Sequence, residues 1–197
     1  MTDRKLSRRE AVGLLAAAVP LASIGPNSVA HAVRQAQAAL VADTPFAPKF
    51  FTAHEWSTVR TLVDILIPRD DHSGSATQAA VPEFMDFILV AYPDEQKWMR
   101  TGLAWLDAES KRRSKKSFLA SNAAERKALL DDIAYPEKAP AEMKDGVHFF
   151  NAFRDFTASG FYSSRMGVDD LQYKGNTVVT EWNGCPDAVL QRLGVHY

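Results

Sequence analysis

Helix caps and prolines divide most of this chain into short segments, and within each segment the apolar residues recur at helical spacing. The clearest segment covers residues 53–67. Thr52 and Glu55 have the spacing of a capping box, in which each side chain bonds a backbone amide at the start of a helix. Pro68 then ends the helix, because proline lacks the amide hydrogen that a continuing helix needs. The pattern therefore predicts a chain built mainly of helices.

The same signals predict four further helices and one short terminal helix, over residues 81–92, 94–117, 122–135, 141–160 and 186–193. No series of segments alternates at the period of two that strands require, although residues 178–180 could form one short strand. The stretch from Phe161 to Pro186 follows neither period. We therefore predict an all-α bundle of five or six helices, closed by an irregular, aromatic-rich C-terminal segment.

The first 32 residues have the composition of an export signal. Basic residues, including the adjacent Arg8 and Arg9, precede an apolar run over residues 11–24 that is too short to span a membrane and is interrupted by a proline. An arginine pair at this position indicates the twin-arginine (Tat) pathway, although an ordinary secretory signal can have the same layout. Ala30 and Ala32 provide the small-x-small pattern that a signal peptidase recognises.

A second pattern of this kind occupies residues 36–38. Residues 33–49 are polar, rich in Ala and Gln, and contain two prolines towards the end, which predicts a linker. We therefore divide the chain into a Tat signal over 1–32, a linker over 33–49 and a single domain over 50–197, long enough for one hydrophobic core. The formal net charge of the whole chain is −1, so a nucleic-acid partner is not expected.

Sequence motifs that would indicate catalysis are missing. The chain contains no GxGxxG, GxxxxGK[ST], CxxC, CxxCH, HExxH or GxSxG pattern. The nearest set of metal-ligand types is Asp70, Asp71 and His72, but neighbouring loop residues point in different directions, which favours a capped, solvated loop. Cys185 is the single cysteine, so it is either a buried thiol or one end of a bridge to another chain.

The segment after residue 160 concentrates large side chains, namely Phe161, Tyr162, Leu171, Tyr173 and Trp182. A long irregular segment is uncommon unless it is functional or disordered, and this aromatic content argues against disorder. Two interpretations stay open. The segment either folds back over the core of its own domain or fills a groove on a partner, where tyrosine and tryptophan are favoured.

Four stretches of the sequence resemble those of a known protein family. They are the twin-arginine leader, LVDILIPRDDHSGSATQAAVPEFMDFIL, FFNAFRDFTASGFYSS and MGVDDLQYKGNTVVTEWNGCP, and the last three span most of residues 50–187. In these stretches the chain resembles the small subunit (gamma, or subunit 3) of gluconate 2-dehydrogenase and of related membrane-associated, FAD-dependent sugar and polyol dehydrogenases.

The resemblance implies a non-catalytic subunit without a cofactor of its own. A large flavoprotein subunit would bind FAD and oxidise the sugar or sugar acid, and a multihaem c-type cytochrome subunit would commonly pass the electrons onward. The small subunit would supply the signal read by the Tat translocase and aid folding, maturation and stability of the flavoprotein. The complex would then lie in the periplasm, associated with the inner membrane.

The resemblance supplies no catalytic, cofactor-binding or metal-binding residues. At the interface with the large subunit we expect Phe161, Tyr162, Tyr173 and Trp182 as anchors, and Cys185 is well placed for a disulfide in the oxidising periplasm. Two alternatives remain. One is a stand-alone periplasmic protein that binds a sugar or sugar acid, and the other is a metal-dependent enzyme built on the acidic loop described above.

Overall fold

The computed structural model describes residues 24–42, 45–173 and 184–196. Within these ranges the chain forms eight α-helices, two 3-10 turns and no strand, so the all-α prediction is confirmed. The α-helices are α2 (Pro26–Leu40), α3 (Ala53–Leu66), α4 (Val81–Ala91), α5 (Gln96–Ser114), α6 (Ala123–Ala134), α7 (Lys144–Ser163), α8 (Arg165–Asp170) and α9 (Asp187–Leu193), and the turns are η1 (Pro93–Glu95) and η2 (Ala141–Met143).

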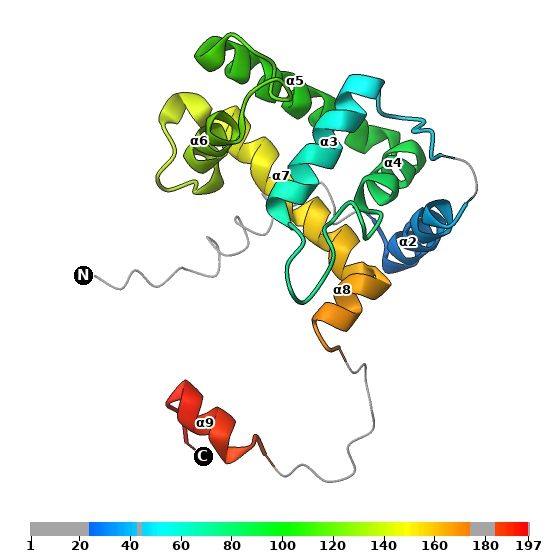
Figure 1. The fold of residues 1–197 in the computed structure, drawn as a ribbon, viewed down its shortest axis with the longest axis vertical. Coiled ribbons are helices and arrows are strands. Elements are labelled where there is room, and N and C mark those ends of the chain that lie inside the picture. Colours follow the sequence, from blue (N-terminus) through cyan, green and yellow to red (C-terminus); the bar gives the residue numbers. More distant parts are fainter. Residues whose placement is uncertain (1–23, 43–44, 174–183, 197) are drawn as a thin grey trace.

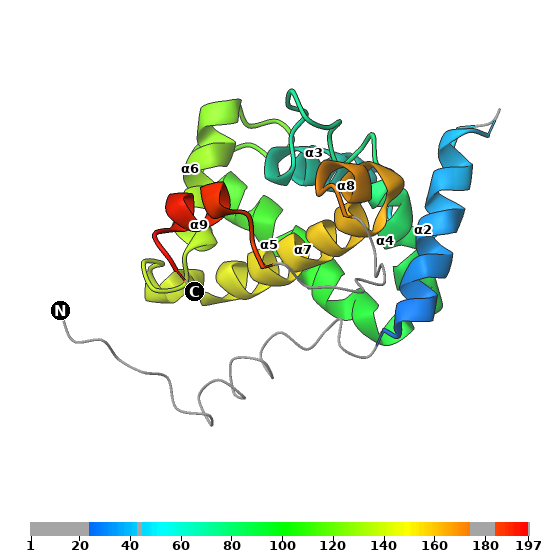
Figure 2. The same cartoon turned by 90° about the horizontal axis from the view of Figure 1, so that it is seen from below.

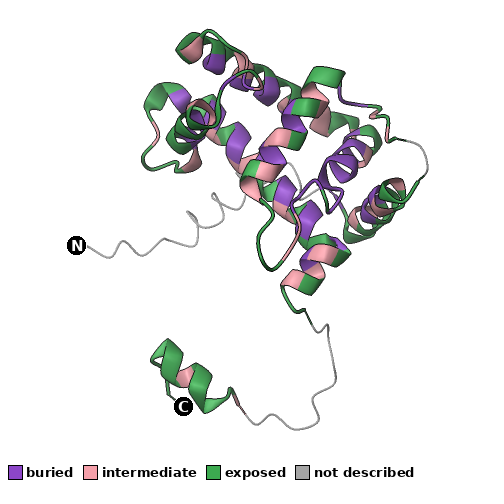
Figure 3. Ribbon diagram, viewed as in Figure 1, coloured by how far each residue is buried: buried purple, intermediate pink, exposed green. Residues whose placement is uncertain are grey.

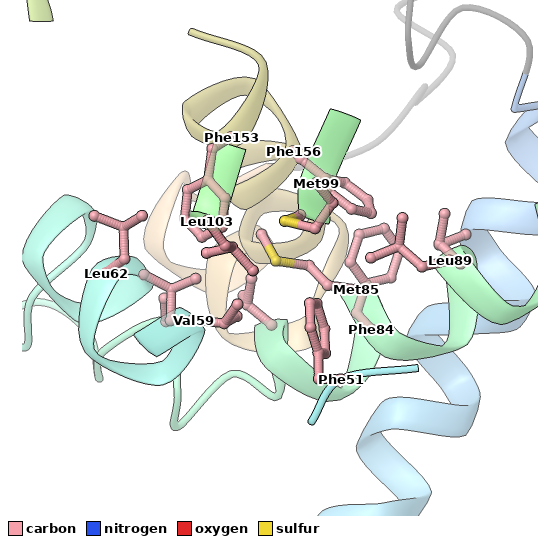
Figure 4. Packing of buried hydrophobic residues seen from close by; sticks show 14 of the residues in the cluster. Phe51, Val59, Leu62, Phe84, Met85, Leu89, Met99, Leu103, Phe153 and Phe156 are labelled. Carbon is pink, nitrogen blue, oxygen red and sulfur yellow. The ribbon is translucent and has the colours of Figure 1, made fainter. Parts of the chain in front are cut away.

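Helix α7 is the central element of the bundle. It contacts α2, α3, α4, α5, α6 and α8, and it crosses the body of the molecule in Figures 1 and 2. Large apolar side chains from α3, α4, α5 and α7 meet in one core, which Figure 4 shows around Met85 and Met99. Both methionines are fully buried, as is Phe153 of α7. Figure 3 shows how the buried positions follow the inward faces of these helices.

The predicted capping box is present at α3, and a second capping box begins α6. Thr52 and Glu55 bond one another's backbone amides at the start of α3, and Asn122 and Glu125 do the same at α6. The carboxylate of Asp86, 1% exposed in α4, accepts hydrogen bonds from the backbone amides of residues 49–51 at 2.9–3.2 Å. This contact fixes the path of the chain just before α3 begins.

Two glycines allow α5 and α7 to cross closely. A Cβ atom added at Gly102 of α5 would lie 1.8 Å from the ring of Phe149 in α7. A Cβ atom added at Gly146 of α7 would lie 2.0 Å from the ring of Trp105 in α5. Each helix therefore has a glycine, and so no side chain, at the point where the other helix inserts an aromatic ring. These two contacts fix the position of α7 against α5.

Two parts of the sequence-based description need correction. Residues 33–40 belong to α2, whose Ala32, Val33 and Ala36 are buried, so the predicted linker is wrong over these residues. At the other end, α7 continues past Gly160 to Ser163, and α8 follows within the segment predicted to be irregular. Gly160 lies inside the helix, and its lack of a side chain is explained by packing, since a Cβ there would come within 2.7 Å of the Phe84 ring.

Candidate partner interface

A sharp change of direction separates α7 from α8. The Ser164 hydroxyl donates to the carbonyl of Phe161 at 2.6 Å and accepts from the amide of Gly167 at 3.1 Å. A Cβ at Gly167 would lie 2.2 Å from the same carbonyl oxygen, so only glycine permits this approach. The serine and the glycine together hold α8 against the end of α7.

Large side chains are exposed near the ends of α7 and α8. Tyr162 is 42% exposed, Leu171 57% and Tyr173 63%. Backbone bonds fix the last two, since the amide of Leu171 donates to the carbonyl of Gly167 and the amide of Tyr173 donates to that of Val168. Exposed large side chains of this kind are typical of a protein–protein contact. We call Tyr162, Leu171 and Tyr173 the α8 patch.

The structure places some of the predicted anchor residues on the surface and another in the core. Tyr162 and Tyr173 lie on the surface, but Phe161 is fully buried in the core and packs edge-to-face on Tyr162 with ring centroids 5.2 Å apart. The prediction of Phe161 as an interface anchor is therefore wrong. Its burial could have been read from the sequence, because Phe153, Thr157 and Phe161 continue the four-residue spacing of α7. Trp182 lies outside the described residues, as does the short strand considered for 178–180.

Cys185 and α9 present a second exposed surface. Cys185 is exposed, so the buried-thiol alternative is wrong. Helix α9 follows directly and contains no buried residue, which Figure 3 shows along its whole length. Val189, Leu193 and Val195 are 43%, 67% and 48% exposed. A short helix that exposes apolar residues gains little stability from its own chain, which suits a segment that packs against another protein.

The acidic loop of Asp70, Asp71 and His72, the alternative metal site, forms hydrogen bonds within the loop itself. The Asp70 carboxylate accepts the backbone amides of His72 and Ser73, each at 2.8 Å, and these bonds lower its pKa. In the part of the chain that the structure describes, no three His, Cys, Asp or Glu side chains gather as metal ligands would. The loop also packs beside α8, since a Cβ at Gly74 would lie 2.9 Å from the Met166 side chain.

One histidine–carboxylate pair lies at the surface between α3 and α5. His54 Nε2 and Asp107 Oδ2 are 2.5 Å apart, and the other oxygen of Asp107 accepts the amide of Phe118. The hydroxyl groups beside this pair already have partners, since Thr52 bonds Glu55 and Thr58 bonds the carbonyl of His54. The pair therefore links α3, α5 and the loop before α6, rather than activating a nearby hydroxyl.

Glu83 is the buried carboxylate that stands out within the described ranges. It is 4% exposed, Oε1 lies 3.7 Å from a nitrogen of Arg60, and Oε2 has no hydrogen-bond partner. Burial raises the pKa of Glu83. The Thr77 hydroxyl, in the loop before α4, is likewise buried without a partner. We assign no chemistry to Glu83, since an isolated buried carboxylate carries none by itself.

The residues of the predicted export signal fall in two places. Arg8 and Arg9 lie outside the described residues, whereas Ala30 and Ala32 lie inside α2. The predicted boundary at residue 32 thus falls within a helix. Among the helices that the structure describes, none is both long and apolar enough to cross a membrane.

Comparison with known proteins gave one finding. The family model described as "Gluconate 2-dehydrogenase subunit 3" matches residues 53–180, which runs from the start of α3 past the α8 patch. The comparisons with curated proteins and with solved structures gave no match.

Proposed function

Because this chain belongs to the gluconate 2-dehydrogenase subunit 3 family, we propose that it is the non-catalytic small subunit of an FAD-dependent sugar or sugar-acid dehydrogenase. The family match over residues 53–180 carries this proposal. FAD is held by the large subunit, and a multihaem c-type cytochrome subunit receives the electrons. The small subunit carries the Tat signal, aids folding and maturation of the flavoprotein, and takes the complex to the periplasmic side of the inner membrane.

The described surface supports a contact role. Tyr162 is exposed near the end of α7, Leu171 and Tyr173 are exposed just after α8, where backbone bonds hold them, and α9 leaves its apolar residues uncovered. The polar groups of the acidic loop and of the His54–Asp107 pair bond their own backbone or neighbouring side chains. The flavoprotein therefore docks on the α8 patch and on the C-terminal segment that contains Cys185.

The export role is tested by changing the arginine pair. In cells that produce all subunits, Arg8→Lys together with Arg9→Lys should leave both this chain and the flavoprotein in the cytoplasm. The matched control is Arg4→Lys, which makes the same chemical change outside the pair and should leave export unchanged. The measurement is flavoprotein antigen and bound FAD in periplasmic and cytoplasmic fractions. Export of the flavoprotein in the double variant would refute the carrier role.

The proposed disulfide has its own test. Purified complex run without reductant should give a band at the summed mass of this chain and the large subunit, and Cys185→Ser should abolish that band. Because Cys185 is exposed, the serine variant should fold normally, which circular dichroism checks. Complete separation of the wild-type subunits without reductant would remove the disulfide from the proposal, while the docking surface would still be tested by substitutions in the α8 patch.

A further inference from the structure

We propose that α2 is a permanent part of the folded subunit, and that its packing blocks peptidase cleavage at residues 30–32 and 36–38. Any removal of the leader then occurs before Pro26. The inference rests on the proposed function in one respect, which is that the chain is folded when it reaches the peptidase.

The first observation is that each predicted cleavage pattern contains a buried alanine, although Ala30 and Ala38 at its other small position are exposed. Within α2, Ala32 is 4% exposed, Val33 7% and Ala36 1%. The peptide bond after Ala32 therefore joins two buried residues near the middle of a 15-residue helix. Proteolysis concentrates at exposed loops and termini, where the chain can leave its own structure to enter a protease. Cleavage after Ala32 requires α2 to leave the domain first.

The second observation is the composition of α4, which α2 covers. Eight of the eleven residues of α4 are buried, so the helix needs neighbours around most of its circumference. Helices α3 and α7 contact α4, and α2 contacts both α4 and α7. Figures 1 and 2 both show α2 lying beside α4 at the edge of the molecule. Removal of α2 would uncover apolar surface on α4.

The contact between α2 and α4 is also specific. Ala32 and Ala36 lie one turn apart, and their small side chains let the two helices approach closely. The Tyr92 hydroxyl, at the end of α4, donates to the Ser28 hydroxyl at 2.5 Å. Just before the helix, Ile24 is 8% exposed and joins the core. A cut after Ala32 would remove Ile24 and Ser28 and leave only eight residues of α2.

The direct test is the mature N-terminus. The subunit is recovered with its complex from wild-type cells, and its N-terminal sequence and intact mass are measured. We expect an N-terminus at or before Pro26. An N-terminus at Val33, at Ala39 or at any other residue beyond Pro26 would overturn the inference.

A pair of variants tests whether packing provides the protection. Ala36→Glu places a carboxylate in the buried face of α2 and should release the helix, so that residues 30–38 become cleavable. Gln35→Glu makes the same change of charge at the neighbouring exposed position and should leave the N-terminus as in the wild type. Resistance of both variants to cleavage would show that packing of α2 is not the cause.

Limited digestion separates this inference from the export role. Elastase cuts after small apolar residues, of which α2 has many. In the purified full chain we expect cleavage within residues 26–40 to be at least about tenfold slower than in Ala36→Glu, since proteolysis follows the population of the open form. A chain that is never exported but resists elastase here would refute the export role alone. Equal cleavage rates in the wild type and in Ala36→Glu would refute the protection by packing of α2, even if export occurs.

Discussion

Gly102→Ala places two known effects in opposition. Alanine is the better helix former by about 1 kcal/mol, so the change would stabilise α5 if nothing else touched the site. However, the new Cβ would lie 1.8 Å from a ring carbon of Phe149, and unstrained carbon contacts need about 3.5–4.0 Å. The ring or the helix must therefore move by about 2 Å.

The surroundings of Phe149 decide which effect is larger. The ring is 3% exposed and packs against Trp98 and Phe153, with centroids 6.3 Å and 5.5 Å away. It cannot turn aside without displacing these neighbours, so the cost should lie at or above the upper end of the 1–3 kcal/mol usual for overpacking. After the gain in helix propensity, we expect a net loss of about 2 kcal/mol. The melting temperature should fall by about 4–8 °C.

The assay is urea unfolding followed by circular dichroism. Ala104→Gly, at an exposed position of α5, is the control and should lose about 1 kcal/mol, which measures helix propensity in this helix. Phe149→Leu should relieve the clash, so Gly102→Ala should cost less in that background. The reasoning is refuted if Gly102→Ala is as stable as the wild type, or if the two substitutions have additive effects.

Three further predictions concern charge and contact. Hydrogen bonds from two arginines, Arg112 first, lower the pKa of Glu109 to about 2, so this carboxylate stabilises the fold above pH 4.5. Glu109→Gln should lose about 1 kcal/mol at pH 7, a figure reduced for solvent screening, and the loss should shrink as the pH falls from 4.5 towards 2 in urea titrations. Burial raises the pKa of Glu83, so its ionisation destabilises the fold, and Glu83→Gln should gain stability relative to the wild type as the pH rises above 4.5. Leu171→Asp with Tyr173→Asp should abolish co-purification of the flavoprotein without lowering the melting temperature, whereas retained binding would exclude the α8 patch from the interface.

The helices that the sequence predicts well are those whose ends are set locally. Helices α3 and α6 each begin with a capping box, in which two side chains three residues apart bond each other's backbone, and both boxes are visible in the sequence. Pro68, Pro93 and Pro136 likewise mark chain segments that no helix crosses. Signals of this kind depend on neighbours within one turn, so no knowledge of the tertiary structure is needed to read them.

The features that the sequence predicts poorly depend on contacts between distant residues. Gly160 indicates a helix end by its residue type, yet it lies inside α7, and the glycine is there because Phe84, 76 positions away, occupies the space of a side chain. Similarly, the alanines of α2 carry a weak hydrophobic signal, and the segment reads equally well as the end of a leader followed by a linker. Contacts with α4 and α7 hold this segment as a helix on the domain.

The α8 patch shows the same division between local and distant causes. Its tyrosines could be selected from the sequence because they are aromatic residues in a segment predicted to be irregular. The same reasoning selects Phe161, which is buried because a neighbouring position on a helix points in another direction. What separates Tyr162 from Phe161 is the side of α7 that packs against the core, since Phe161 continues the buried row of Phe153 and Thr157. The packing of α7 on the core therefore determines which of these two aromatic residues is exposed.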